Sequence, residues 1–547
     1  MSAGLEPSAV QQTADDRRIQ RKLGFWSLVS IGIGSVIGSG WLFSAMNAAH
    51  GAGPAAMISW LIGGAIMLAM ALVVAELGMT FPESGGLSRY PLYSHGKLVA
   101  ALIGWCSVIA VLGIPALEAA GAMQYASTWV PGLFKDDGLT MLGIGAAALL
   151  LAGFTALNYF GVRLFARSTT VVTAIKVWTP VIAVIALAVS SFAGNGSSGG
   201  VDNFTKQGFA PFGWTASLAI IATTGILFAF NGAQVIVTVS GEVENPRRTI
   251  PRAMIVTMLV TIVLYLALQA VFVLAAPADA VAHGWGTVSF DSPYSDLALL
   301  AGMQWLSWIL IADAGISPSG AAVIVVAANA RNVYALSKNR FLPGWLQKID
   351  DRWGVPRRAL VVNYLIGLVF LVAMPSWSSL ISVIGVLIVF TIGIPAVSVG
   401  VFRRVGITAQ AGTALPGVGV LAPLVFAAGG LVLSWVPSEQ ADKTIPILLI
   451  GVIWYGVTYA SQKHGIDHLR SGVWLVLFFT FLYVADYLGS FGTDVITAPW
   501  DSIIVFLGSL AFYRWGVNAG ARHMADHPLA PAEQRVPDDG ELSPLAH

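Results

Sequence analysis

Charged side chains are scarce in this sequence. Only 10% of its 547 residues are Asp, Glu, Lys or Arg, whereas 56% are hydrophobic and the mean hydropathy is +0.76. Soluble domains typically contain about 25% charged residues, so this composition excludes an ordinary water-soluble protein. We therefore expect an all-α polytopic protein that lies in a lipid bilayer.

Cysteine and cofactor motifs are also sparse. The single cysteine, Cys106, excludes an intrachain disulfide. The sequence contains no Walker loop and no zinc-ligand cluster, and Gly465 argues against a helical site at His464 and His468. Residues 1–22 have no apolar region, so we do not expect a signal peptide. We expect no enzyme activity, no cofactor, no metal and no nucleic-acid partner.

The apolar residues fall into fourteen windows of about 20 residues, the length that crosses a hydrocarbon core of ~30 Å. The windows begin near Leu23, Pro54, Leu98, Leu139, Ser168, Trp214, Arg252, Trp305, Ala359, Trp377, Pro416, Thr444, Val473 and Ser502. They predict an N-terminal tail (1–22), a first five-helix repeat (23–195), an external linker (196–213), a second repeat (214–404), four additional helices (416–518) and a C-terminal tail (519–547). The glycine-rich stretch 194–200 predicts a flexible linker.

Basic residues are distributed unequally between the two sides of the predicted bundle. Lys135, Lys206 and Lys443 are the only ones in the loops of one side, and Lys176 is the only one left inside a window. All others lie in the two tails and in the loops of the opposite side. The positive-inside rule therefore predicts a multi-pass protein of the cytoplasmic membrane with both termini in the cytoplasm.

Two windows are interrupted. Residues 32–43 include four glycines, and residues 228–233, Phe-Ala-Phe-Asn-Gly-Ala, interrupt a second apolar window. Unwound backbone inside a membrane persists only where it lines a cavity or holds a ligand. Ser39 and Phe230 each lie sixteen residues into their windows, which is about half-way across the bilayer at 1.5 Å per residue. A pair of broken helices in corresponding positions of two halves is typical of secondary transporters.

The second half is expected to be inverted relative to the first. An odd number of helices per block makes the second block enter the membrane from the opposite side. Sequence motifs agree with this architecture: residues 38–43 (Gly-Ser-Gly-Trp-Leu-Phe), 75–78 with 82–86, 228–232, and 244–253 (Glu-Asn-Pro-Arg-Arg-Thr-Ile-Pro-Arg-Ala). Together they resemble the amino acid-polyamine-organocation (APC) superfamily, with its leucine-transporter-type five-plus-five inverted repeat. Residues 41–43, 89–96 and 317–320 look most like bacterial aspartate-proton symporters.

The breaks predict a site for a zwitterionic amino acid. Free N–H groups near Ser39 and Gly40, at the start of the outer half-helix, suit a carboxylate. Carbonyl groups freed near residues 33–36, and those at residues 228–230, suit an ammonium group. The candidate substrate-binding residues are Ser35, Val36, Gly38, Ser39, Gly40, Phe228, Phe230, Asn231 and Gly232. The alternative is that the glycines only allow close helix packing.

Individual side chains at the breaks also have two interpretations. Asn231 either bonds the substrate or bonds a neighbouring helix. The superfamily usually has an apolar residue at that position, and the pair Ala233-Gln234 replaces the Phe-Glu of many members. Phe228 and Phe230 either gate the site or pack in the core.

Lys176 and Glu118 are the candidate proton-coupling residues. An ionisable group inside the membrane is costly and is a functional hypothesis by default. Lys176 resembles by position a helix 5 lysine that replaces sodium in proton-coupled relatives, although a lysine snorkelling to headgroups is the alternative. Glu118, which lies among small residues, is expected to carry a proton or to pair with a charge of the substrate. The same two roles are open to Asp313, and lining an outer vestibule is its alternative. Glu76 is expected to pair with arginines of the inner loops.

These features predict a secondary active transporter that imports an acidic amino acid, aspartate or glutamate, with protons and by alternating access. An amino-acid exchanger or amine permease is the first alternative. A membrane nutrient sensor that binds without transport is the second. The four additional helices either form a homodimer contact or shield the core.

Overall fold

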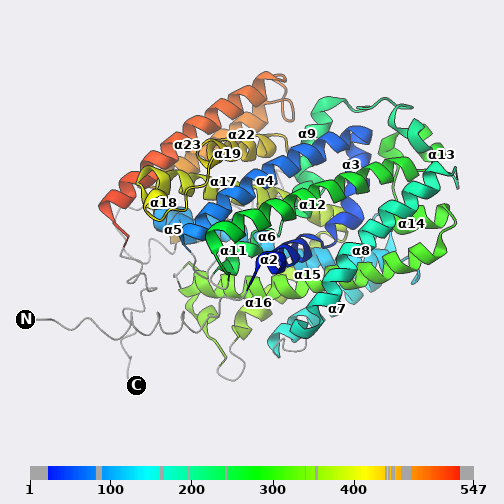
Figure 1. Ribbon diagram of the computed structural model, residues 1–547, viewed down its shortest axis with the longest axis horizontal. Helices are drawn as coiled ribbons and strands as arrows, with labels where there is room; N and C mark the ends of the chain where they lie inside the picture. Colours follow the sequence, from blue (N-terminus) through cyan, green and yellow to red (C-terminus); the bar gives the residue numbers. More distant parts are fainter. Residues whose placement is uncertain are drawn as a thin grey trace, which may run out of the picture.

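The computed structural model describes residues 23–81, 89–160, 165–194, 196–240, 243–338, 341–350, 355–437 and 470–529, with isolated positions between 440 and 457. This part of the chain is mostly helical (Figure 1). The elements up to residue 204 are α2 (Phe25–Val36), α3 (Gly40–Ala52), η1 (Gly53–Ala55), α4 (Ala56–Thr80), α5 (Arg89–His95), α6 (Lys97–Ala126), β1 (Phe134–Lys135), β2 (Gly138–Leu139), α7 (Met141–Tyr159), α8 (Phe165–Phe192) and η2 (Gly200–Phe204).

The remaining elements continue in chain order. Those up to residue 338 are α9 (Gly213–Thr223), α10 (Ile226–Ala229), α11 (Val235–Thr238), α12 (Pro246–Ala275), α13 (Ala278–Ala282), η4 (Trp285–Thr287), α14 (Pro293–Leu300) and α15 (Gln304–Lys338). After them come η5 (Gly344–Gln347), α16 (Arg357–Ala373), α17 (Trp377–Arg404), α18 (Ile407–Gln410), α19 (Val418–Ser434), α22 (Val473–Leu488) and α23 (Trp500–Asp526).

Eight described helices are long and apolar enough to cross a membrane, and four shorter apolar helices accompany them. Two of the short ones, α2 and α9, are the first parts of the interrupted windows. Most of the predicted window that begins at Thr444 lies outside the described residues, as do residues 82–86 and many basic residues of the loops and tails. The count of fourteen helices and the sidedness therefore stay predictions.

The helices run side by side along the long axis of the molecule, and α6 lies at the centre (Figure 1). Of the apolar window of α6, 83% is buried, compared with 28% for α23. Helix α6 packs against α15 and α17, whereas α23 packs against α19, α17 and α22. The helices beyond residue 416 thus cover one flank of the core, and a homodimer contact through them stays a prediction.

The glycine-rich linker is hydrogen-bonded where it is described. Its backbone pairs with the segment that joins α12 to α13, through Gly199 N–H to Ala276 O (2.9 Å) and Ala278 N–H to Ser197 O (2.9 Å). Asn203 donates to two carbonyl groups at the end of α12. These bonds satisfy carbonyl groups that the end of a helix leaves free, and the flexibility of the linker stays a prediction.

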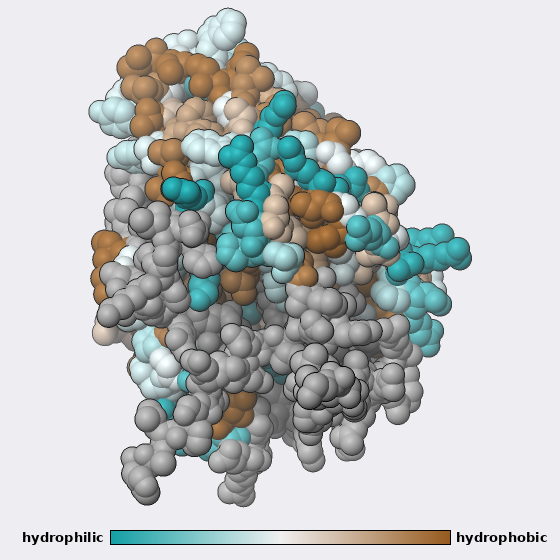
Figure 2. Space-filling view, turned by 90° about the vertical axis from the view of Figure 1, so that its left-hand side faces the viewer, coloured by the Kyte–Doolittle hydropathy of each residue, from teal (hydrophilic) through white to brown (hydrophobic). Residues whose placement is uncertain are grey.

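Glu76, at the end of α4, pairs with an arginine as expected. Its two carboxylate oxygens accept from Nε and Nη2 of Arg403 in α17, both at 2.6 Å. One of them also accepts from Leu415 N–H at 2.9 Å. The pair ties α4 to α17 and to the segment before α19. In the view of Figure 2, which faces the left-hand end of Figure 1, hydrophilic side chains gather near the middle of the face and at its right-hand rim.

Candidate functional site

The first predicted break is present between α2 and α3. Helix α2 ends at Val36, and residues 37–39 lie outside both helices. Ile37 N–H donates to Ile33 O at 3.0 Å, and Leu42 N–H donates to Ser39 O at 3.0 Å. The chain therefore unwinds for three residues deep inside the bundle.

The second interrupted window is broken twice. Helix α9 ends at Thr223, a left-handed Gly225 (φ 93°) leads into the short α10, and a turn over residues 230–234 precedes α11. The break at residues 228–233 was predicted, but the one at Gly225 was missed. The run Thr223-Thr224-Gly225 was an available signal, because β-branched residues followed by glycine weaken a helix.

The two breaks touch each other through glycines. Gly232 has a φ of 138°, and a Cβ atom placed on it would lie 2.6 Å from the backbone oxygen of Ser35. A Cβ atom on Gly40 would lie 3.0 Å from Cα of Ala229. Both positions require glycine because only glycine allows this backbone approach. The structure thus brings the unwound segments of the two windows together.

Polar groups of the first break are bonded to the surrounding helices. Ser39 N–H donates to the Glu118 carboxylate of α6 at 3.0 Å, and Trp377 Nε1–H donates to the Ser39 hydroxyl at 2.8 Å. The expectation of a free N–H at Ser39 was therefore wrong. The N-terminus of α3 attracts an anion, as predicted, but the anion in place is a side chain of the protein. Gly38 leaves room for it, because a Cβ atom there would lie 2.8 Å from Oε1 of Glu118.

Lys176 of α8 lies at the same break. Its side chain is 2% exposed, and Nζ donates to Gly34 O at 2.8 Å. The snorkelling alternative is wrong, since the ammonium group faces the unwound segment. Tyr265 OH donates to Val36 O at 3.3 Å, and the Ser35 hydroxyl donates to Ile31 O at 2.7 Å. Several carbonyl groups expected to be free for a ligand are thus occupied.

The second break faces a separate small cavity among methionines. Asn231 and Gln234 line it, and the Gln234 side-chain amide donates a hydrogen bond to Oδ1 of Asn231. Among the described residues, the Asn231 side chain makes no hydrogen bond to α4 or α12. The other lining residues come from α4, α12, α17 and the break itself: Met67, Met70, Ala71, Val74, Phe230, Ala233, Met254, Met258, Ile388 and Thr391. Methionine side chains adapt to ligands of different shapes.

The two predicted aromatic residues are placed differently. Phe230 is fully buried, with ring centroids 5.6 Å from Trp60 and 5.2 Å from Tyr265, which is core packing. Phe228 lies beside Trp377 (6.4 Å between centroids) and next to Gly40, at the junction of the two breaks.

Trp377 was missed by the sequence interpretation, since a tryptophan at the start of an apolar helix carries no specific signal. The Gly40, Phe228 and Trp377 cluster is therefore a product of the fold.

Asp313 of α15 is also buried, with 1% exposure, so the vestibule interpretation is wrong. Its Oδ1 accepts from the Ser317 hydroxyl at 2.6 Å. Lys176 interacts by charge with both Asp313 and Glu118. Lys176 and Glu118 thus lie at the first break, and Asp313 is a second buried carboxylate, farther along the bundle, that interacts by charge with Lys176.

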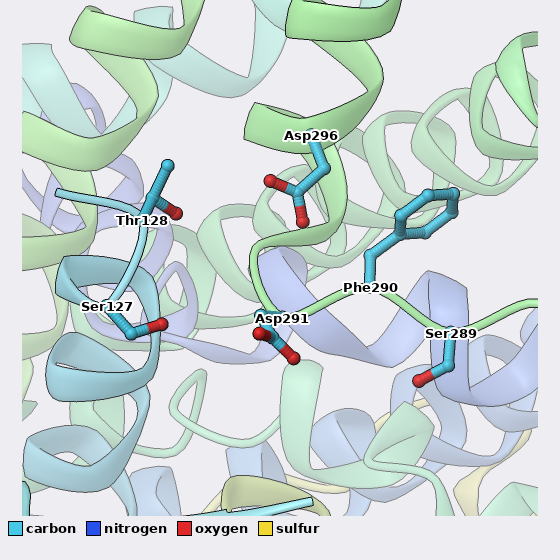
Figure 3. Close-up of a pocket in the computed structure, with 6 residues that line it drawn as sticks. All are labelled: Ser127, Thr128, Ser289, Phe290, Asp291 and Asp296. Carbon is cyan, nitrogen blue, oxygen red and sulfur yellow. The ribbon is translucent and has the colours of Figure 1, made fainter. Parts of the chain in front are cut away.

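A second hollow opens between the end of α6 and the segment before α14 (Figure 3). Its lining is polar and acidic: Ser127, Thr128, Ser289, Phe290, Asp291 and Asp296. In Figure 3 the Asp296 carboxylate points toward the segment that carries Asp291, whose own carboxylate points away from Asp296. Burial raises the pKa of Asp296 to about 6, and burial also raises the pKa of Asp291.

Geometry and charge together define what the site can do. Two unwound segments meet in the bundle, and one ammonium group and one carboxylate bond the backbone of the first segment. The Lys176, Glu118 and Ser39 side chains are buried. Such an arrangement suits a small ligand with both charges that replaces internal bonds.

Comparison with known proteins identifies the family of the chain. The family described as amino acid permease matches residues 23–459. The glutamate/serine transporter AimA of Bacillus subtilis is 36% identical over 515 residues, covering 92% of this chain and 94% of the relative. The aspartate-proton symporter of the same organism is 34% identical over 511 residues, with 92% and 97% covered. The branched-chain amino acid permease BcaP is 25% identical over 361 residues, with 63% and 73% covered. The chain is a multi-pass membrane protein that belongs to the amino acid permease family of the APC superfamily.

Proposed function

We propose that the protein imports an acidic amino acid, aspartate or glutamate, together with protons across the cytoplasmic membrane. The observation that carries this proposal is the contact between the two helix breaks, with Lys176 and Glu118 at the first of them. The relatives named as a glutamate/serine transporter and an aspartate-proton symporter support the substrate class.

Substrate binding replaces internal bonds in this proposal. The carboxylate of the amino acid takes the Ser39 N–H from Glu118, and the amino group binds carbonyl groups of Ser35, Val36 and Phe228. Gly38, Gly40 and Gly232 keep the backbone accessible, while Asn231 and Phe230 lie toward the methionine cavity. The substrate thereby displaces Glu118 from the Ser39 N–H. Glu118 and the neighbouring Lys176 then couple proton binding to substrate binding.

The transport cycle rests on the five-plus-five inverted repeat, with both termini in the cytoplasm. Rocking of one helix bundle against the other around the breaks gives alternating access. The absence of a nucleotide-binding motif in the sequence favours an ion gradient as the energy source.

Uptake into proteoliposomes tests the proposal. Purified protein is reconstituted, and radiolabelled aspartate uptake is measured with an imposed inward pH gradient, without sodium, and again with a protonophore. We expect accumulation above the outside concentration with the gradient and none with the protonophore. Equal uptake under both conditions would contradict proton symport. A Glu118→Gln variant that keeps the wild-type pH dependence of aspartate uptake would contradict the role of Glu118.

A thermal-shift screen tests the substrate class separately. Ligands of the folded protein stabilise it by RT ln(1 + [L]/Kd). We expect aspartate and glutamate to raise the melting temperature, while a set of amines does not.

The acidic hollow favours a second candidate function, an amine permease. At low ionic strength, the negative charges of Asp291 and Asp296 attract cations rather than dicarboxylates. Stabilisation by amines alone in the thermal-shift screen would support this candidate over the first.

A further inference from the structure

One buried carboxylate oxygen at the site has no hydrogen-bond partner. Oδ2 of Asp313 is inaccessible to solvent and unpaired, while Oδ1 holds the Ser317 hydroxyl. The nearby Thr179 hydroxyl interacts with the carboxylate but donates its hydrogen to Ile175 O at 3.0 Å. An unpaired ionised oxygen inside a membrane protein is costly. A protonated carboxyl group removes that charge.

Asp313 lies on the side of α15 that faces the first break. Ser317 and Ala321 follow it at intervals of four residues, which places all three on a similar face of the helix. Ala321 contacts the break, because a Cβ atom on Gly38 would lie 3.6 Å from its Cβ. Asp313 is thus two turns, ~12 Å along the helix axis, from the level of the break, towards the end of α15 that adjoins α14.

One added proton would balance the charges of Glu118, Asp313 and Lys176. Glu118 and Asp313 carry two negative charges when ionised, and Lys176 carries one positive charge. Glu118 already accepts from Ser39 N–H, a bond that suits an ionised carboxylate. Lys176 donates to Gly34 O and makes no ion pair within 4.0 Å among the described side chains. Of these three side chains, Asp313 is the one with a buried oxygen atom that has no hydrogen-bond partner.

We propose that Asp313 carries the coupled proton of the transport cycle, a refinement that rests on the proposed proton symport. In the loading step a hydronium ion gives its proton to Oδ2, an O–H bond forms there, and water leaves. With Asp313 neutral, Lys176 stays on Gly34 O and holds the break in the shape seen here. When the proton leaves, the negative charge of Asp313 draws the ammonium group away from Gly34, and the break loosens.

The groups that face Asp313 come from three helices. Lys176 and Thr179 lie on α8 and Ser317 on α15 itself. The Tyr125 hydroxyl on α6 also interacts by charge with Asp313, and with Asp296 of the acidic hollow. Tyr125 bonds Ser292 and Tyr294 beside the hollow, and in this proposal the proton enters from that side.

Two transport modes of the Asp313→Asn variant test the proposal. Asparagine resembles the protonated carboxyl group in shape and lacks its charge. We expect exchange of labelled for unlabelled aspartate, with equal pH on both sides, to stay within about threefold of wild type. Accumulation driven by a pH gradient should fall at least tenfold, and proton entry measured with a pH-sensitive dye inside the vesicles should disappear.

Controls separate this proposal from the proposed function. Asp279→Asn, at an exposed position of α13, should keep both modes. Asp313→Glu should keep gradient-driven uptake with a shifted pH dependence, and it provides the test if the asparagine variant does not fold. Gradient-driven accumulation and dye-reported proton entry at wild-type levels in Asp313→Asn would overturn the assignment of Asp313. A wild-type protein that ignores the pH gradient would instead overturn proton symport itself.

Discussion

Replacement of Glu76 by glutamine should destabilise the fold by a measurable amount. The Glu76 side chain is fully buried, whereas Arg403 is 25% exposed. The carboxylate holds two guanidinium N–H groups and the Leu415 N–H. Glutamine keeps one acceptor oxygen and introduces an N–H₂ group that faces the donors of Arg403.

The magnitude follows from the bonds that are lost. Removing one partner of a buried ion pair costs about 3–5 kcal/mol, because the other charge is left uncompensated. Arg403 retains a bond to Leu415 O at 2.6 Å and partial access to solvent. We therefore expect the lower end of that range, about 3 kcal/mol.

Unfolding in detergent, followed by tryptophan fluorescence against denaturant concentration, measures this loss. Arg404→Gln is the matched control, since Arg404 is the next residue of α17 and bonds Asn518 at an exposed position. Exposed pairs contribute about 0–1 kcal/mol. A double variant with Arg403→Gln should lose less than the sum of the single losses, because the two side chains act as one unit. Equal midpoints for wild type and Glu76→Gln would refute the role of the pair.

Three further outcomes are expected. Gly232→Ala, which would place Cβ 2.6 Å from a backbone oxygen of the first break, should abolish aspartate uptake, whereas Gly145→Ala, with open space around it, should leave uptake unchanged. Trp377→Phe loses its hydrogen bond to Ser39 and should raise the KM for aspartate about 3- to 10-fold in uptake assays; an unchanged KM would contradict a role of this bond in binding. Burial lowers the pKa of His95 to about 4, so the unfolded chain gains a proton below pH 6.5 that the folded chain does not, and stability should fall by ~3 kcal/mol as the pH falls from 6.5 to 4. Denaturant titrations across this range should show the loss in wild type and not in His95→Phe.

Several features could be predicted from the sequence because they depend on local chemistry. Hydropathy windows predicted the long apolar helices among the described residues, since a backbone in hydrocarbon must bond internally. The interruptions at residues 32–43 and 228–233 predicted a break in each window, whereas the further break at Gly225 was missed. The rarity of charge in the interior directed attention to Lys176, Glu118 and Asp313 before any contact was known.

Only the tertiary structure decided which partners these groups have. Glu118 and Ser39 are 79 residues apart in sequence, and Trp377 is 338 residues from Ser39, so no local pattern relates them. The free N–H predicted at Ser39 is occupied, Lys176 turns inward rather than to headgroups, and one oxygen of Asp313 is left unpaired. Each outcome depends on how distant helices pack, because a hydrogen bond is set by the position of both partners, whereas a sequence window specifies only one of them.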